Sequence, residues 1–147
     1  MSVKLTPFTQ LSGAFRARIV KTWHISSDLS PAEAAAHLND VAVEHSFVRR
    51  AKPVPGAALA EWGRSGVTPL WAALAALVLL LKTGWRPASD EEWAGFAALY
   101  IQLCKSKELA VLTVELPASI DQSLATGWLC AAIEEDERYL LTKKVAS

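Results

Sequence analysis

The chain has 147 residues, with 15 Lys and Arg against 15 Asp and Glu, and 52% of its residues are apolar. This length predicts one globular domain over residues 1–147, and the apolar share excludes an intrinsically disordered chain. The net charge of zero argues against a dedicated nucleic-acid-binding domain, because such domains are usually strongly basic.

The first predicted element is a strand over Phe15–Ile25, which reads FRARIVKTWHI. Phe15, Ile19 and Trp23 fall on one parity of this segment, while its two arginines and His24 fall on the other. A period of two with aromatic and β-branched residues is typical of a half-buried strand.

A helix is predicted from Ser30 to about Phe47. Its first residues, SPAE, form a capping box with proline at the first helical position. The stretch Arg49–Gly56 contains two prolines and a glycine, so it is predicted to be a loop. A short helix is expected to follow it.

The run Leu70–Leu81 is apolar without interruption. As a helix it would be about 18 Å long at about 1.5 Å per residue, which is too short to span a bilayer. Thr68 is the predicted N-cap, and Gly84 stands just beyond the last turn. We therefore expect a buried apolar helix over residues 69–83 and no membrane span.

The C-terminal third begins with a predicted helix capped at Ser89. The apolar run Leu109–Leu116 then favours a buried strand, a further helix extends to about residue 133, and Arg138–Val145 is predicted to be an edge strand. The acidic stretch Glu134–Glu137 would end that helix, where the dipole disfavours negative charge, so it indicates a turn, a cation or a basic partner surface.

These elements predict an α+β fold in one compact, helix-rich domain. We expect four to five helices around the buried apolar helix 69–83. A small three-stranded sheet is expected to combine the N-terminal strand with a C-terminal βαβ-like unit.

A polar stripe on the first predicted helix is the most suggestive candidate for metal chemistry. Glu33, His37, Asp40 and Glu44 are spaced four, three and four residues apart, so they share one helix face. Such a face resembles half of a helical di-metal site, but no other predicted helix offers matching ligands. A solvated face is the favoured interpretation, and no metal ligand is predicted.

His45 falls on the apolar face of the same helix, which predicts a buried imidazole. It is interpreted either as a hydrogen-bonded core or helix-end residue, which is favoured, or as a general base or ligand. The sequence contains no phosphate-binding glycine loop, nucleophile elbow or zinc-protease motif, so we predict no catalytic residue and no cofactor. Enzymatic activity is left open but is not favoured.

Two cysteines, Cys104 and Cys130, are too few for a disulfide scaffold and fit a reducing compartment. Both lie on predicted apolar helix faces, where a cysteine is usually a small buried hydrophobe. The residues at 1–12 lack the basic region and apolar run of a secretory signal. We therefore expect a cytoplasmic protein.

Six tryptophans are the compositional oddity of the chain. Several lie near the ends of predicted elements, where they serve as core corners, pocket walls or anchors for a partner. Basic residues gather on the first predicted strand and before the proline-rich loop. The candidate interaction residues are Trp62, Trp85, Trp93, Arg16, Arg18, Arg49 and Arg50.

The favoured hypothesis is a small non-enzymatic interaction subunit, acting as an adaptor, accessory protein or inhibitor. Its partner is predicted to be another protein or a further copy of the chain, because a neutral, apolar protein docks readily. The frequent alanines fit a bacterial or phage assembly. The alternative is a small-molecule-binding or enzymatic domain with a tryptophan-lined pocket near His45, using a carboxylate such as Glu44. A third, weaker hypothesis is binding of a nucleic-acid backbone through Arg16 and Arg18.

Overall fold

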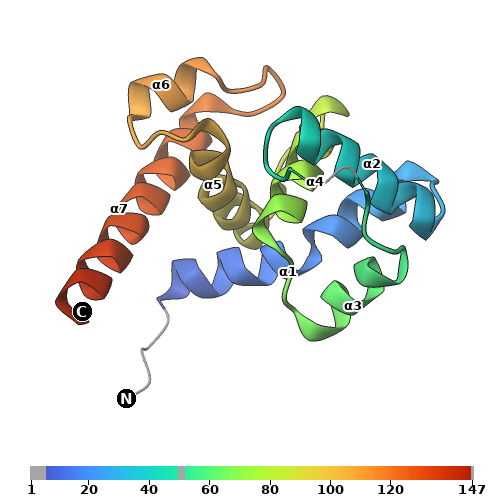
Figure 1. Cartoon of the computed structure of the whole chain (residues 1–147). Helices are drawn as coiled ribbons and strands as arrows, with labels where there is room; N and C mark the ends of the chain where they lie inside the picture. The colour runs from blue at the N-terminus through green and yellow to red at the C-terminus, as the bar shows by residue number, and fades with distance from the viewer. Residues whose placement is uncertain (1–5, 50–51, 147) are drawn as a thin grey trace. The chain divides into compact units, whose positions relative to one another are not determined.

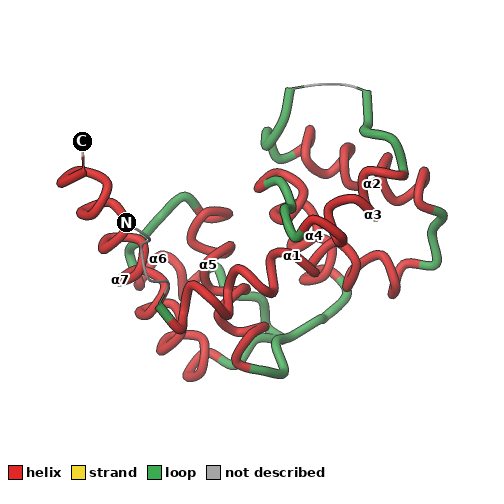
Figure 2. The backbone as a smooth tube through the Cα atoms, turned by 90° about the horizontal axis from the view of Figure 1, so that it is seen from below, coloured by secondary structure: helices red, strands yellow, loops and turns green. Residues whose placement is uncertain are grey.

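The computed structural model describes residues 6–49 and 52–146, and these residues form helices and connecting loops (Figures 1 and 2). No strand occurs in these ranges, so the predicted α+β fold with its three-stranded sheet is wrong. The helices of the described chain are α1 (Pro7–Ser27), α2 (Pro31–Glu44), α3 (Ala57–Ser65), α4 (Leu70–Lys82), α5 (Asp90–Cys104), α6 (Leu109–Val114) and α7 (Gln122–Ala146).

The chain divides into two compact units. Residues Ala14–Trp85 form the α4 unit, and residues Met1–Gly13 together with Arg86–Ser147 form the α7 unit. In sequence, the α4 unit carries eight Lys and Arg against five Asp and Glu, whereas the α7 unit carries seven against ten. Their net charges are therefore +3 and −3. The expectation of a single domain stays a prediction.

The core of the α4 unit is α4, in which nine consecutive residues from Ala72 to Leu80 are buried. The predicted buried apolar helix is thus confirmed, and α2 packs along it. No single helix of the described chain is long and apolar enough to cross a membrane, and α3 with α4 reaches that length only as a pair bent by 104°.

Thr68 does not cap α4 as predicted, because the helix begins two residues later, at Leu70. The Thr68 side chain is buried, and its hydroxyl donates to the carbonyl oxygen of Ala17 over 3.5 Å. Its own carbonyl oxygen accepts a hydrogen bond of 3.0 Å from Nε of Arg16. Thr68 therefore joins the start of α4 to α1.

The predicted strand at Phe15–Ile25 is part of helix α1. Its buried residues are Phe15, Ile19, Val20 and Trp23, which recur at helical spacing. The error has a physical origin: positions 15, 19 and 23 are four apart, and a spacing of four suits both a strand face and a helix face. The burial of Val20, on the other parity, distinguishes the two.

In the α7 unit, α5 packs against α7 through buried residues on both helices. The predicted cap of α5 is confirmed, because the Ser89 hydroxyl accepts a hydrogen bond of 3.2 Å from the Glu92 backbone. The second predicted strand, Leu109–Leu116, is wrong, since its first six residues form α6. Only Leu112 is buried there, and its carbonyl oxygen accepts a hydrogen bond of 3.1 Å from the Tyr100 hydroxyl.

The third predicted strand, Arg138–Val145, is the last part of α7. Neither glycine nor proline occurs after Gly127, so no residue breaks the helix. The acidic stretch Glu134–Glu137 consequently lies within the helix rather than at its C-terminus. These acidic side chains therefore do not lie at a helix C-terminus, where the helix dipole would disfavour them, and the predicted turn is not needed.

Two helix-associated glycines provide a test of this packing. A Cβ atom added at Gly127 in α7 would meet no atom within 4 Å. A Cβ atom added at Gly56 would lie 2.8 Å from the backbone nitrogen of Ala32 and 2.8 Å from the carbonyl carbon of Pro31. Gly127→Ala is therefore expected to raise the free energy of unfolding by about 1 kcal/mol, the helix-propensity difference. Gly56→Ala is expected to lower it by about 1–3 kcal/mol through overpacking.

Urea denaturation followed by circular dichroism at 222 nm measures both effects. Similar changes in the two variants would contradict this packing, because it gives them opposite signs.

Candidate functional site

A groove of about 790 Å³ lies between α1 and α3 in the α4 unit. Val20 and Leu59, both buried, contribute apolar side chains to it, and alanines and glycines make up half of the remaining lining residues. No phenylalanine, tyrosine or tryptophan side chain lines the groove. Its volume falls in the range of about 300–1,000 Å³ that is usual for small-molecule sites.

Every charged side chain that lines this groove is basic. Arg18, Lys21 and Arg64 contribute, together with His24, and no carboxylate is among the lining residues. The Arg64 guanidinium is held by Glu61 at 2.6 Å, while Nε2 of His24 lies 2.8 Å from the carbonyl oxygen of Leu29. Lys21 is exposed on α1. The groove thus combines an apolar floor with a positive rim.

A second, smaller groove of about 380 Å³ lies within the α7 unit, between the start of α1, α5 and α7. Its polar groups are largely engaged with one another. The Thr9 hydroxyl donates to Glu135 over 3.0 Å, Arg138 lies 3.9 Å from the same carboxylate, and Lys107 lies 3.2 Å from Asp136. This groove therefore offers few unpaired polar groups to a ligand.

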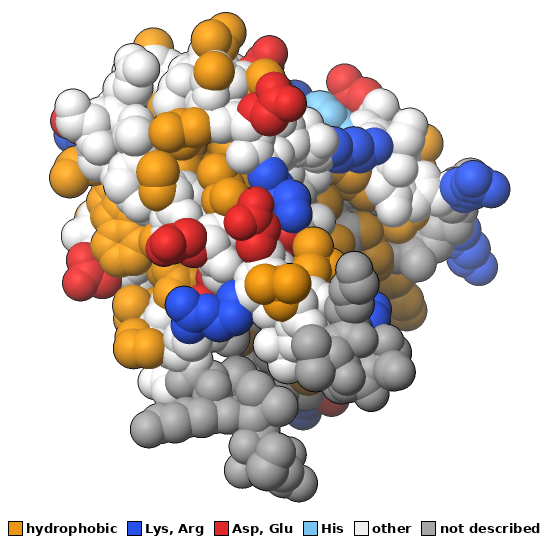
Figure 3. Space-filling model, turned by 90° about the vertical axis from the view of Figure 1, so that its left-hand side faces the viewer, with side chains coloured by type: hydrophobic (Ala, Val, Ile, Leu, Met, Phe, Trp, Pro, Cys, Tyr) orange, Lys and Arg blue, Asp and Glu red, His pale blue; other side chains and the backbone are white. Residues whose placement is uncertain are grey.

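The last described turns of α7 are exposed on every side. All residues from Glu137 to Lys143 are exposed, among them Tyr139 at 62%, Leu140 at 48% and Leu141 at 64%. In Figure 1 the C-terminal end of α7 extends beyond α5 and α6. On the side viewed in Figure 3, hydrophobic side chains lie at the surface among acidic and basic ones.

The three tryptophans predicted as interaction residues are engaged inside their own units. Trp85 stacks on Phe15 with ring centroids 5.7 Å apart, and Trp62 meets Trp71 edge to face at the same distance. Trp93 is only 8% exposed. Trp62 and Trp85 are half-buried, and the role of the three tryptophans as interaction residues stays a prediction.

The four candidate arginines have different surroundings. Arg16 is held by its bond to the Thr68 carbonyl, Arg18 lines the α1–α3 groove, and Arg49 is exposed after α2. Arg50 lies outside the described residues. The structure therefore brings Arg18 to the groove together with Lys21, which sequence reasoning missed.

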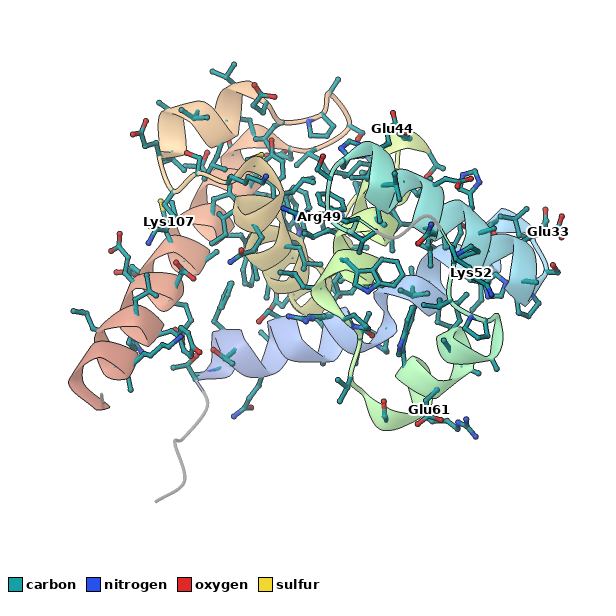
Figure 4. The ribbon with its side chains drawn as sticks, in the orientation of Figure 1. Glu33, Glu44, Arg49, Lys52, Glu61 and Lys107 are labelled. Carbon is teal, nitrogen blue, oxygen red and sulfur yellow. The ribbon has the colours of Figure 1, made fainter. Side chains whose placement is uncertain are left out.

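The polar stripe Glu33, His37, Asp40 and Glu44 is exposed on α2, and Figure 4 shows Glu33 and Glu44 near opposite ends of that helix. The capping box is confirmed, because the Glu33 carboxylate accepts the Ser30 backbone N–H over 3.1 Å. Its hydrogen bonds with Ser30 lower the pKa of Glu33. The His37 ring stacks on Trp23 at 6.0 Å, and the described residues contain no group of three or more potential metal ligands.

His45 is exposed, so the expectation of a buried imidazole is wrong, whereas the interpretation as a helix-end residue agrees with its position at the end of α2. The helix ends at Glu44, and His45 is the C-cap residue, whose ring stacks on Phe47 at 5.4 Å. The helical face on which it was expected to be buried does not continue to position 45. His45 lines neither of the two grooves.

The α1–α3 groove was not predicted, although one signal for it is present in the sequence. Ala17, Lys21 and His24 recur at spacings of four and three, which places them on one face once the segment is helical. In the predicted strand, Lys21 and His24 would lie on opposite faces, because one position is odd and the other even. The α3 side of the groove depends on tertiary packing, for which this stretch has no local signal.

Comparisons of the chain with protein-family models, with curated proteins and with solved structures found no match. Proposals about its function therefore rest on the grooves and on the exposed end of α7.

The two cysteines have different environments, which makes their reactivity testable. Burial raises the pKa of Cys104, and the negative charge of Glu115 raises it further, whereas a hydrogen bond with Tyr100 lowers it. Cys130, in contrast, is exposed. Only the thiolate reacts readily, so iodoacetamide at pH 7.5 is expected to alkylate Cys130 at least about tenfold faster than Cys104. Peptide mass spectrometry over a time course measures both rates, and equal rates would contradict the half-buried position of Cys104.

Proposed function

We propose that this protein is a non-enzymatic protein–protein interaction subunit that assembles with a second copy of itself through α7. The observation that carries the proposal is the complete exposure of Glu137–Lys143, which includes three large apolar side chains. Helices in proteins owe most of their stability to tertiary packing of an apolar face. A partner for this helix end would supply the packing that the α7 unit does not provide.

The order of residues along α7 supports a second copy as that partner. The helix reads acidic at Glu134–Glu137, apolar at Tyr139–Leu141 and basic at positions 143 and 144. In an antiparallel pair centred on the apolar residues, the acidic Glu137 of each copy lies near the level of the basic Lys143 of the other. Apart from Arg138, the charges that flank the apolar residues therefore favour the antiparallel arrangement.

The register follows from helical periodicity. Positions 133, 137, 140 and 141 share one face of a helix, because position 137 is four residues from both 133 and 141 and three residues from 140. In an antiparallel pair centred between Leu140 and Leu141, each of these leucines faces the other across the two-fold axis. Such a contact is isologous, which is the commonest arrangement in soluble homo-oligomers.

Light scattering after size exclusion tests this proposal with the full chain. The mass expected is twice the chain mass of 15.9 kDa. Leu141→Glu places a charge at the centre of the proposed contact and is expected to weaken dimerisation at least about thirtyfold, the effect of losing a hot-spot residue.

Leu124→Glu is the matched control, since Leu124 is 54% exposed on the same helix but lies far from the proposed contact. It is expected to leave the dimer intact, and circular dichroism confirms that both variants are folded. A monomeric wild-type chain, or a dimer that Leu141→Glu leaves unchanged, would refute the α7 contact.

A further inference from the structure

We propose that the α1–α3 groove binds a single-chain aliphatic carboxylate, with its chain along the apolar floor and its head group at the basic rim. This site is independent of the α7 contact, since all its lining residues belong to the α4 unit. The inference rests on the volume of the groove, on the chemistry of its floor and on the sign of its rim.

The floor selects for an aliphatic chain. Apart from the basic side chains, the groove is lined by alanine, glycine, valine, leucine and proline. His24, the one ring at the groove, is bonded to the carbonyl oxygen of Leu29. A sugar or a nucleotide would find no array of side-chain hydrogen-bonding groups on such a floor, and no phenylalanine, tyrosine or tryptophan ring is present on which a base could stack. An alkyl chain needs neither and gains free energy from leaving water.

The rim selects for an anionic head group. Lys21 is exposed at the groove and forms no ion pair within the described residues, while Arg18 lines the same α1 wall. Glu61 already holds Arg64, so Lys21 provides the main attraction for an anion. The net charge of +3 on the α4 unit acts in the same direction.

Gly63 provides access to the floor from the α3 side. It lines the groove, it is exposed, and a Cβ at this position would meet no atom within 4 Å. A larger side chain at position 63 therefore has room to extend into the groove without disturbing the backbone. Gly63 is thus the position at which the groove can be filled by substitution.

Isothermal titration calorimetry of the full chain with monomeric octanoate, decanoate and dodecanoate tests the proposal. Saturable binding of one carboxylate per chain is expected, tightening by up to about fourfold for each added methylene group. Decyltrimethylammonium, which has the same chain and the opposite charge, is expected to bind at least about tenfold more weakly than decanoate. Equal affinity for the two amphiphiles would overturn the assignment of the rim.

Variants locate the site. Lys21→Glu is expected to weaken decanoate binding by about fivefold or more at low salt, with a smaller effect at 0.5 M salt. Lys52→Glu is the matched control, because Lys52 is an exposed lysine of the same unit that does not line the groove (Figure 4). Gly63→Leu is expected to abolish binding, whereas Gly127→Leu, the same change in the other unit, is expected to leave it unchanged.

Three results would overturn the proposal. The first is the absence of decanoate binding. Binding of anionic phospholipid vesicles, or of a helical peptide of leucine and glutamate, would not rescue the proposal if decanoate itself does not bind. The second is unchanged affinity in both Lys21→Glu and Gly63→Leu, each shown by circular dichroism to be folded. The third is equal weakening by a groove variant and by its matched control.

Discussion

The burial of α4 is the constraint on which the α4 unit depends. A helix that is apolar around its whole circumference has no face that it can leave in water, so other segments must cover it on every side. α2 packs along it, and α1 contacts the residues at both of its ends, through Arg16 at Thr68 and through Phe15 at Trp85. The position of α1, and with it one wall of the groove, follows from this requirement.

The elements that sequence reasoning predicted correctly are those with two independent signals. α2 and α5 combine a serine cap with apolar periodicity, and α4 combines an apolar run with flanking proline and glycine. The errors arose where a single signal suits two structures. Apolar residues four positions apart made α1 resemble a strand, and a short apolar run made α6 resemble one. At the end of α7 an edge strand was predicted, although no residue there breaks a helix.

The candidate sites were less predictable than the helices, because each depends on packing that no local pattern records. The groove joins residues of α1 to residues about 40 positions later, and only Arg18 of its basic side chains was singled out from the sequence. The tryptophans were chosen for their size and polarity, but the ring contacts of Trp85 with Phe15 and of Trp62 with Trp71 depend on how the helices pack. His45 was misplaced by the point at which α2 ends, and helix ends are the least predictable feature of a sequence.

The opposite net charges of the two units affect how the protein behaves as a colloid. Near its isoelectric point of about 6.8 the whole chain has no net charge that would keep molecules apart. A positive unit on one molecule and a negative unit on another still attract each other at low ionic strength. Added salt shortens the range of this attraction to about 8–10 Å near physiological concentration. The solubility of the protein at neutral pH therefore rises with moderate salt, so buffers of very low ionic strength favour non-specific association.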